Sequence, residues 1–175
     1  MPDPLYVGDV VLHDDEHTAH VTLTLGSREG PFKNTFSQVH ALQRPDYIAF
    51  VVCAQPGLPV LPHTVYVNKN AYLSEKHGAL HWGPGHVGVA AGMYEGVRRG
   101  LLTDSQAENL LCIAVVWLWE TATDLDRVCQ QTRDATLAAL EQAMSQPSHR
   151  GALEEAVRQR GFYNPYHALA TPTGE

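Results

Sequence analysis

The sequence predicts a single α/β domain, and three observations support that prediction. Residues 18–25 alternate apolar and polar side chains, which is the periodicity of a half-buried strand. The runs 47–54 and 112–119 are apolar throughout, as strands covered on both faces are. Apolar residues recur at helical spacing in 123–144. At 175 residues, the chain is long enough to bury a core without disulfides or metals.

The first expected strand, 18–25, has one core face and one polar face. The polar face carries His20, Thr22 and Thr24. A glycine-rich turn at 26–30 follows, and Pro31 suits the first position of a helix. We expect this helix to end near Leu42, because Pro45 disfavours helical backbone just before it.

Two further strands are expected at 47–54 and 64–68, and the second ends at Lys69. We interpret the segment 83–85, Gly-Pro-Gly, as a tight turn that opens the next helix. The same glycines would also let backbone amides approach an anion. The segment matches neither GxGxxG nor the P-loop, so it carries no nucleotide-binding fingerprint.

Glycines recur every four residues at Gly88, Gly92 and Gly96. On a helix they form a stripe without side chains, and each costs about 1 kcal/mol relative to alanine. We therefore expect another backbone to pack closely against this stripe. Thr103, followed three residues later by Gln, matches a capping box for a short helix through Leu110.

The last third of the chain predicts two helices. Thr123 is expected to cap a long helix through Met144. Its expected inner face consists of Leu125, Val128, Thr132, Ala135, Ala139 and Ala143. A polar helix over 150–160 should end at Gly161. The aromatic segment 162–167 is expected to dock on this subunit or on a neighbour.

Composition argues against a nucleic-acid partner. The chain has 12 Lys plus Arg against 19 Asp plus Glu, a formal charge of -7, and no basic cluster longer than Arg98-Arg99. Its first residues lack the charged and apolar regions of a signal peptide, and no apolar run reaches membrane-spanning length. We expect a soluble, cytoplasmic protein with no membrane partner.

His20 is the sharpest candidate for chemistry, because a histidine on the polar face of a strand can exchange a proton near neutral pH. Alternatively it is a surface or hydrogen-bonded histidine with no catalytic role. Lys69 either aims its charge into a cleft or simply ends its strand in solvent.

Ten histidines raise the question of a metal. The cluster at 13–20 places three histidines beside an acidic run at 14–16, and His77 and His81 are spaced i, i+4. Neither group is a zinc signature, so we expect an exposed acidic loop and no metal site. Trp117 and Trp119 are interpreted as core or interface residues.

A set of single residues and short motifs lies at fixed spacings along the chain. It comprises Ala19-His20, Gly26, Pro31, Phe36, Leu58-Pro59, Pro62, Asn68-Lys69, Gly83-Pro84 and Gly88-Val89-Ala90. In order and spacing, this set resembles the formaldehyde-activating enzyme family. The similarity runs from about Thr18 to Ala90 and continues more weakly through the long helix and the tail.

The resemblance implies an α+β fold of the ribosomal protein S5 domain 2-like type over residues 1–170, with a flexible tail at 171–175. It also implies a homopentamer with a pterin site between neighbouring subunits. The implied activity is that of a lyase of one-carbon metabolism, a hydro-lyase that condenses formaldehyde with tetrahydromethanopterin, or another reduced pterin, to give the methylene-pterin and water. His20 matches the proposed general acid of the family, and Lys69 matches a lysine that contacts the pterin.

Four positions depart from the family pattern. Thr22 stands where the family has aspartate, Ala71 where it has threonine, His86 where it has glutamine, and Val51 where it has leucine. A carboxylate at the first position would favour a charged, oriented imidazole, whereas threonine supplies only a neutral hydrogen bond. We predict that Lys69, Thr22, Val51, Ala71 and His86 line the substrate pocket. The sequence leaves open whether Asp14, Asp15 or Glu16 replaces the missing carboxylate.

Two readings of the function with a ligand site therefore stand. They stand beside a third, a pentameric scaffold without a ligand, which fits the glycine stripe and the aromatic tail but leaves the polar face of the first strand unexplained. The first is a divergent enzyme that condenses formaldehyde, or a small aldehyde, with a reduced pterin, using His20 as the acid. The second is a catalytically silent paralogue that binds formaldehyde or a pterin as a sensor or assembly subunit, which the loss of the aspartate motivates. Fold resemblance alone does not transfer activity, so only the site can decide between them.

Overall fold

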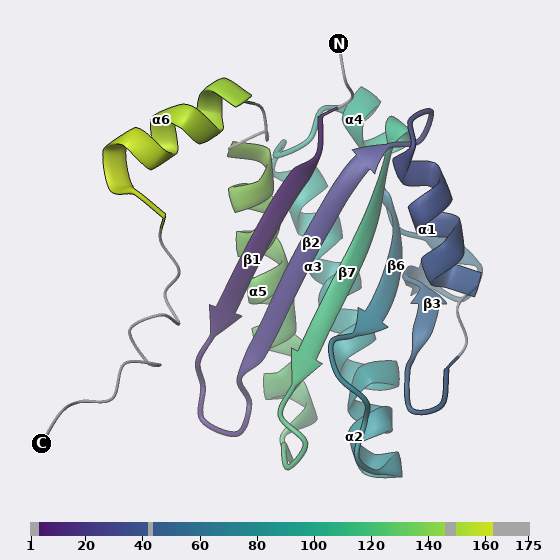
Figure 1. Ribbon diagram of the computed structural model, residues 1–175. Helices are drawn as coiled ribbons and strands as arrows, with labels where there is room; N and C mark the ends of the chain where they lie inside the picture. Colours follow the sequence, from purple (N-terminus) through teal and green to yellow (C-terminus); the bar gives the residue numbers. More distant parts are fainter. Residues whose placement is uncertain (1–3, 42–43, 146–149, 163–175) are drawn as a thin grey trace, which may run out of the picture.

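The computed structural model describes residues 4–41, 44–145 and 150–162. A five-stranded sheet in the order β1-β2-β7-β6-β3 forms its centre (Figure 1). These strands are Tyr6–Leu12, Ala19–Ser27, Leu110–Leu118, His63–Asn68 and Ala49–Val51. Neighbouring strands are antiparallel except β6 and β7, which run parallel. The predicted single α+β domain is confirmed, and the finer S5 domain 2-like assignment stays a prediction.

Two helices, α3 (His86–Arg98) and α5 (Leu125–Ser145), cover one face of the sheet (Figure 1). The alternation predicted for β2 explains this packing, because its core-face residues are fully buried against α5. These residues are Ala19, Val21, Leu23 and Leu25. The polar residues between them face the opposite side of the sheet.

The expected close approach to the glycine stripe is confirmed, and its partner is α5. A Cβ on Gly88 would lie 2.7 Å from the carbonyl oxygen of Cys129, and one on Gly92 would lie 2.7 Å from that of Arg133. Real Cβ atoms do not come this close to backbone oxygens. Because glycine has no side chain, α3 and α5 can pack at this short distance.

The segment at 83–85 is not a tight turn, contrary to the sequence interpretation. The helix α2 (Glu75–Leu80) continues through a π-helical turn at His81–Gly85 directly into α3. Pro84 lies inside this turn. Proline cannot donate the usual helical hydrogen bond, and a local widening of the helix accommodates that loss without ending it.

The apolar run 47–54 is also not one buried strand. It divides at Val52 into β3 and a second strand, β4 (Cys53–Gln55), which forms a small hairpin with β5 (Leu58–Pro59). Val52 donates its N–H to Thr64 and accepts a hydrogen bond from Val60, so the backbone changes partner there. As the edge strand of the main sheet, β3 is only half-buried.

The remaining helices follow the sequence closely. The helix α1 spans Phe32–Ala41, α6 spans Arg150–Arg160, and α4 (Asp104–Asn109) has the predicted capping box. Two details of α5 differ from expectation. Asp124, whose carboxylate accepts the N–H of Arg127 at 3.0 Å, lies just before the helix, and Leu125 is 54% exposed because it precedes the first inward-facing turn. The tail at 171–175 and most of the segment 162–167 lie outside the described residues.

Candidate functional site

Among the described residues, the helix on the second face of the sheet is α1, which covers one end of it (Figure 1). Gly26 of β2 lies directly beneath α1, since a Cβ there would lie 2.5 Å from the ring of Phe32. His20 lies on the same face, six residues away, which is about 20 Å along an extended strand. The polar end of β2 is therefore left open beyond the helix.

Four side chains from three segments meet at this open end. His20 and Thr22 come from β2, Asp9 from β1, and Lys69 from the residue that follows β6. The N–H of Lys69 bonds to the carbonyl of Val116 at 2.8 Å, so the ladder between β6 and β7 continues by one residue. That contact fixes the base of the lysine side chain, which then reaches across β7 to β2.

Lys69 and Asp9 both contact Nε2 of His20, and their charged atoms are 3.8 Å apart. The ammonium Nζ of Lys69 lies 2.9 Å from Nε2 and 3.2 Å from Nδ1 of His20, and it donates to the hydroxyl of Thr22 at 3.1 Å. The carboxylate Oδ1 of Asp9 lies 2.8 Å from His20 Nε2. Thr22 donates its hydroxyl proton to the same carboxylate oxygen. The structure therefore brings His20, Thr22 and Lys69 together, and their roles in catalysis and binding stay predictions.

Sequence reasoning missed Asp9. Burial raises the pKa of its carboxyl, but the hydrogen bonds from Thr22 and His20 outweigh this, and with the charges of His20 and Lys69 they leave the pKa below its ordinary value. Asp9 is thus ionised at neutral pH. Its side chain is 47% exposed, and ion pairs this exposed contribute about 1 kcal/mol or less to stability. Stability alone gives little reason for such a cluster.

When His20 carries a proton on Nε2, it can donate that proton to Asp9. The ammonium of Lys69 then places a positive charge within 3.2 Å of both ring nitrogens. A second proton would make the imidazole of His20 positively charged. The ammonium of Lys69 would repel that charge, and the carboxylate of Asp9 would attract it. The site can therefore hold a proton on an imidazole between a cation and a carboxylate.

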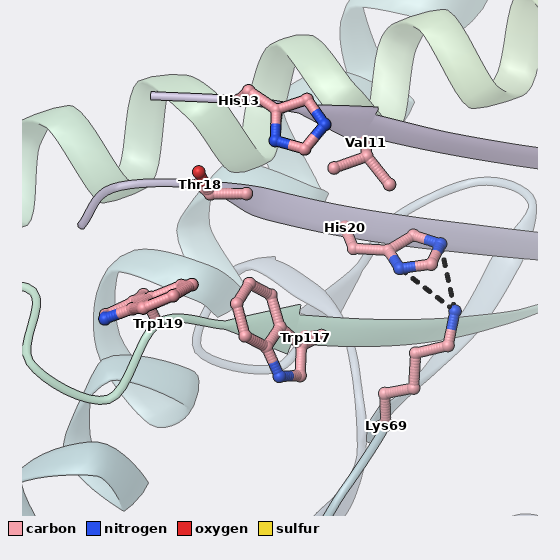
Figure 2. Close-up of a pocket in the computed structure, with 7 residues that line it drawn as sticks. All are labelled: Val11, His13, Thr18, His20, Lys69, Trp117 and Trp119. Atoms are coloured by element: carbon pink, nitrogen blue, oxygen red, sulfur yellow. Dashed lines mark hydrogen bonds between the residues drawn. The ribbon is translucent and has the colours of Figure 1, made fainter. Parts of the chain in front are cut away.

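A pocket of about 310 Å³ adjoins the cluster, at the lower end of the size range of small-molecule sites. Its lining consists of Val11, His13, Thr18, His20, Lys69, Trp117 and Trp119 (Figure 2). The rings of Trp117 and Trp119 meet edge to face at 5.3 Å. The sequence interpretation of these tryptophans assigned them no chemistry, whereas they form an aromatic wall beside a titratable histidine.

The other predicted substrate-binding residues do not line this pocket. Val51 lies in the edge strand β3, and Ala71 lies in the loop after β6. His86 begins α3, on the far face of the sheet, where its Nε2 accepts the N–H of Cys53 at 3.0 Å. Burial lowers the pKa of His86, against smaller opposing effects of its backbone hydrogen bonds. A substrate-binding role for these three residues stays a prediction.

The histidine pair of α2 and the π-helical turn is internal. His77 accepts the N–H of Leu73 at 3.2 Å and donates to the carbonyl of Leu118 at 3.1 Å, so both ring nitrogens are used by the fold. His81 pairs with the hydroxyl of Tyr66 at 2.6 Å. Within the part of the chain that the structure describes, no three His, Cys, Asp or Glu side chains lie close enough to hold a metal ion.

In the acidic loop, the carboxylate of Asp14 is bound by α5 and not by His20. Asp14 forms an ion pair with Arg127 of α5 and accepts a hydrogen bond from Gln131 at 3.2 Å. The hydrogen bond from Arg127 is the main cause that lowers the pKa of Asp14. This contact ties the loop between β1 and β2 to α5, and the carboxylate that reaches His20 comes from inside β1 instead.

Comparison with known sequences decides the family. A sequence profile of the formaldehyde-activating enzyme family matches residues 7–162. The chain belongs to the formaldehyde-activating enzyme family. The match spans both strands that form the cluster and the strand that ends at Lys69.

Three relatives of this chain come from methanogens. The chain is 28% identical over 158 residues to the 5,6,7,8-tetrahydromethanopterin hydro-lyase of Methanosarcina barkeri, covering 90% of this chain and 87% of that protein. It is 26% identical over 140 residues to the bifunctional enzyme Fae/Hps of Methanococcoides burtonii and 28% identical over 142 residues to that of Methanothrix thermoacetophila. These two matches cover 80% and 79% of this chain, but only 35% of each bifunctional protein.

Across residues 4–41, 44–145 and 150–162, no helix is both long enough and apolar enough to cross a membrane.

Proposed function

We propose that this protein is a hydro-lyase that condenses formaldehyde with a reduced pterin, such as tetrahydromethanopterin, to give the methylene-pterin and water. The observation that carries the proposal is the cluster of His20, Lys69, Thr22 and Asp9 beside the aromatic pocket. The name of the Methanosarcina barkeri relative supports the same reaction class.

The chemistry requires one proton donor. A pterin nitrogen adds to the carbonyl carbon of formaldehyde, and the resulting carbinolamine must lose its hydroxyl group to form an iminium ion. His20 gives a proton to that hydroxyl, which leaves as water. The second pterin nitrogen then attacks the iminium carbon and releases its own proton, which returns the imidazole to its starting state.

Each remaining group of the site has a role in this scheme. Lys69 places a positive charge beside His20, where it can contact the pterin and favour release of the proton from the imidazole. Trp117 and Trp119 offer flat apolar surface for the pterin ring system. The open side of the pocket admits formaldehyde, which is small enough not to need a dedicated cavity.

The proposal extends to assembly. Val51, Ala71 and His86 lie away from the pocket of their own subunit, so as pterin contacts they would have to act on a site shared with a neighbouring subunit. A homopentamer in the cytoplasm, with one such site at each subunit boundary, is the arrangement that we propose. Light scattering coupled to size-exclusion chromatography tests it, and a monomer at micromolar concentration would contradict it.

The silent-paralogue reading has lost its main support. It was motivated by the threonine at position 22, where a carboxylate was expected beside the acid. Asp9 supplies a carboxylate 2.8 Å from the imidazole, so the enzyme is the better supported of the two functions.

Stopped-flow measurement of the condensation tests the proposal. Formaldehyde is mixed with tetrahydromethanopterin, and separately with tetrahydrofolate, with and without the protein. We expect the protein to accelerate one of the two reactions above its spontaneous rate, which identifies the acceptor. No acceleration with either pterin, by protein that is folded and correctly assembled, would contradict the proposed function.

A further inference from the structure

The carboxylate beside His20 comes from a neighbouring strand. In the antiparallel register of β1 and β2, Asp9 lies directly opposite Thr22, and His20 lies opposite Val11. Asp9 is therefore the cross-strand partner of Thr22 and the diagonal neighbour of His20, a distance that polar side chains can bridge. Both strands are regular here, so their backbones fix the carboxylate in front of the ring.

We propose that Asp9 is the positioning residue for His20: its carboxylate holds the imidazole by Nε2 and balances the charge of Lys69, so that His20 can carry the proton that it gives to the departing hydroxyl group. This inference rests on the proposed function of His20 as the acid.

The charges around His20 explain why a carboxylate is needed. Among the residues that the structure describes, three charged or titratable groups face it: Asp9 from β1, Lys69 after β6, and His13, which lines the same pocket. The facing residue of β7, Trp117, carries no charge. Asp9 is the negative group of this set. Without it, a protonated His20 would stand against the ammonium of Lys69 with no opposing charge.

Thr22 completes the arrangement because its hydroxyl group acts in two directions. It donates to Asp9 and accepts from Lys69 at 3.1 Å, so it bridges the carboxylate and the ammonium. Asp9 and Thr22 thus act as one cross-strand pair. Exchanging the two residues keeps one carboxylate and one hydroxyl in the pair and moves the carboxylate from β1 to β2, still on the same face of the sheet.

The experiment compares three variants with the wild type. Asp9→Asn removes the charge and keeps the shape, and the double variant Asp9→Thr with Thr22→Asp exchanges the pair. Asp14→Asn is the matched control, because Asp14 is also in an ion pair and borders the same two strands, but binds Arg127 instead of His20. For each protein, kcat and KM are measured against pH, and the His20 ring is followed by NMR during a pH titration.

We expect Asp9→Asn to shift the alkaline limb of the kcat–pH profile to lower pH by about one unit. At pH values above that limb, kcat is then about tenfold lower than in wild type. KM for the pterin should stay within about twofold, since Asp9 does not line the pocket. The NMR midpoint of His20 should move in the same direction by the same amount. The exchanged pair should recover most of both losses, and Asp14→Asn should behave as wild type.

The NMR titration separates the two ways of failing. If the wild type does not accelerate condensation, the proposed function fails, but the His20 midpoint still tests the role of Asp9. If Asp9→Asn leaves both the midpoint and the pH profile of the wild type unchanged, the inference about Asp9 is overturned even though the enzyme is active. An equal loss of kcat at every pH, with an unchanged midpoint, would make Asp9 merely structural and would also overturn it.

Discussion

Acid should destabilise this protein through His81. The side chain is fully buried, its Nδ1 is bonded to the hydroxyl of Tyr66 at 2.6 Å, and its Nε2 has no hydrogen-bond partner among the described residues. Burial, and then the neighbouring His77, lower the pKa of His81 from 6.5 to about 3. The folded protein thus keeps this imidazole neutral over a pH range in which the unfolded chain protonates it.

The sign and size of the effect follow from linkage. As pH falls below about 6.5, the unfolded state binds a proton that the folded state does not, so the free energy of unfolding decreases until the pH reaches about 3. The full loss is of the order of 5 kcal/mol, and the part between pH 7 and pH 5 is about 2 kcal/mol.

Urea unfolding at pH 7, 6 and 5 measures this loss. His81→Asn keeps an acceptor near Tyr66 but cannot ionise, so it should lose about 2 kcal/mol less than wild type between pH 7 and pH 5. His40→Asn, which removes one exposed imidazole from α1, is the matched control. Equal losses for wild type and His81→Asn, within about 0.5 kcal/mol, would refute the reasoning.

Three further predictions concern packing, the acidic loop and the pocket. Gly92→Ala places a Cβ 2.7 Å from the carbonyl of Arg133 and should cost about 1–3 kcal/mol of unfolding free energy in urea, whereas Gly83→Ala, with open space around it, should cost much less. Arg127→Ala breaks an exposed ion pair and should leave the urea midpoint of unfolding close to that of wild type; a clear drop in the midpoint would mean that the loop stabilises the fold. Lys69→Met should raise KM for the pterin in steady-state assays, and an unchanged KM would remove Lys69 from the binding site.

The sequence predicted β2 and its two faces because one face of that strand is packed and the other is open. The same alternation placed His20 and Thr22 together, and the end of β6 placed Lys69. The stripe of Gly88, Gly92 and Gly96 correctly indicated a close helix neighbour. These features depend on local spacing, which a single sequence records directly.

The strand β1 could not be recognised in this way. Gly8 occupies its core-face position because the carbonyl oxygen of Ala139 lies 1.8 Å from where a Cβ would be. An apolar side chain there would have signalled a strand, whereas glycine followed by Asp9 reads as a turn. Asp9 was therefore missed because close packing against Ala139, 131 residues later in the chain, requires glycine at position 8 and so removes the strand pattern around it.

The aromatic wall was missed for a different reason. The run that forms β7 is apolar on both faces, so its pattern does not tell which face is open. Only the position of α1, which stops short of this end of the sheet, leaves Trp117 beside His20. Likewise, the π-helical turn keeps one helix continuous through Gly83-Pro84-Gly85, which local turn signals alone do not predict.

The most direct test of the proposed chemistry compares wild type with His20→Gln in the stopped-flow condensation, at the pH of maximum activity. Loss of the general acid should lower kcat by about 100- to 10,000-fold, while pterin binding, measured separately by calorimetry, stays within a few-fold of wild type. A His20→Gln variant that binds pterin and turns over formaldehyde at the wild-type rate would contradict the assignment of His20 as the acid.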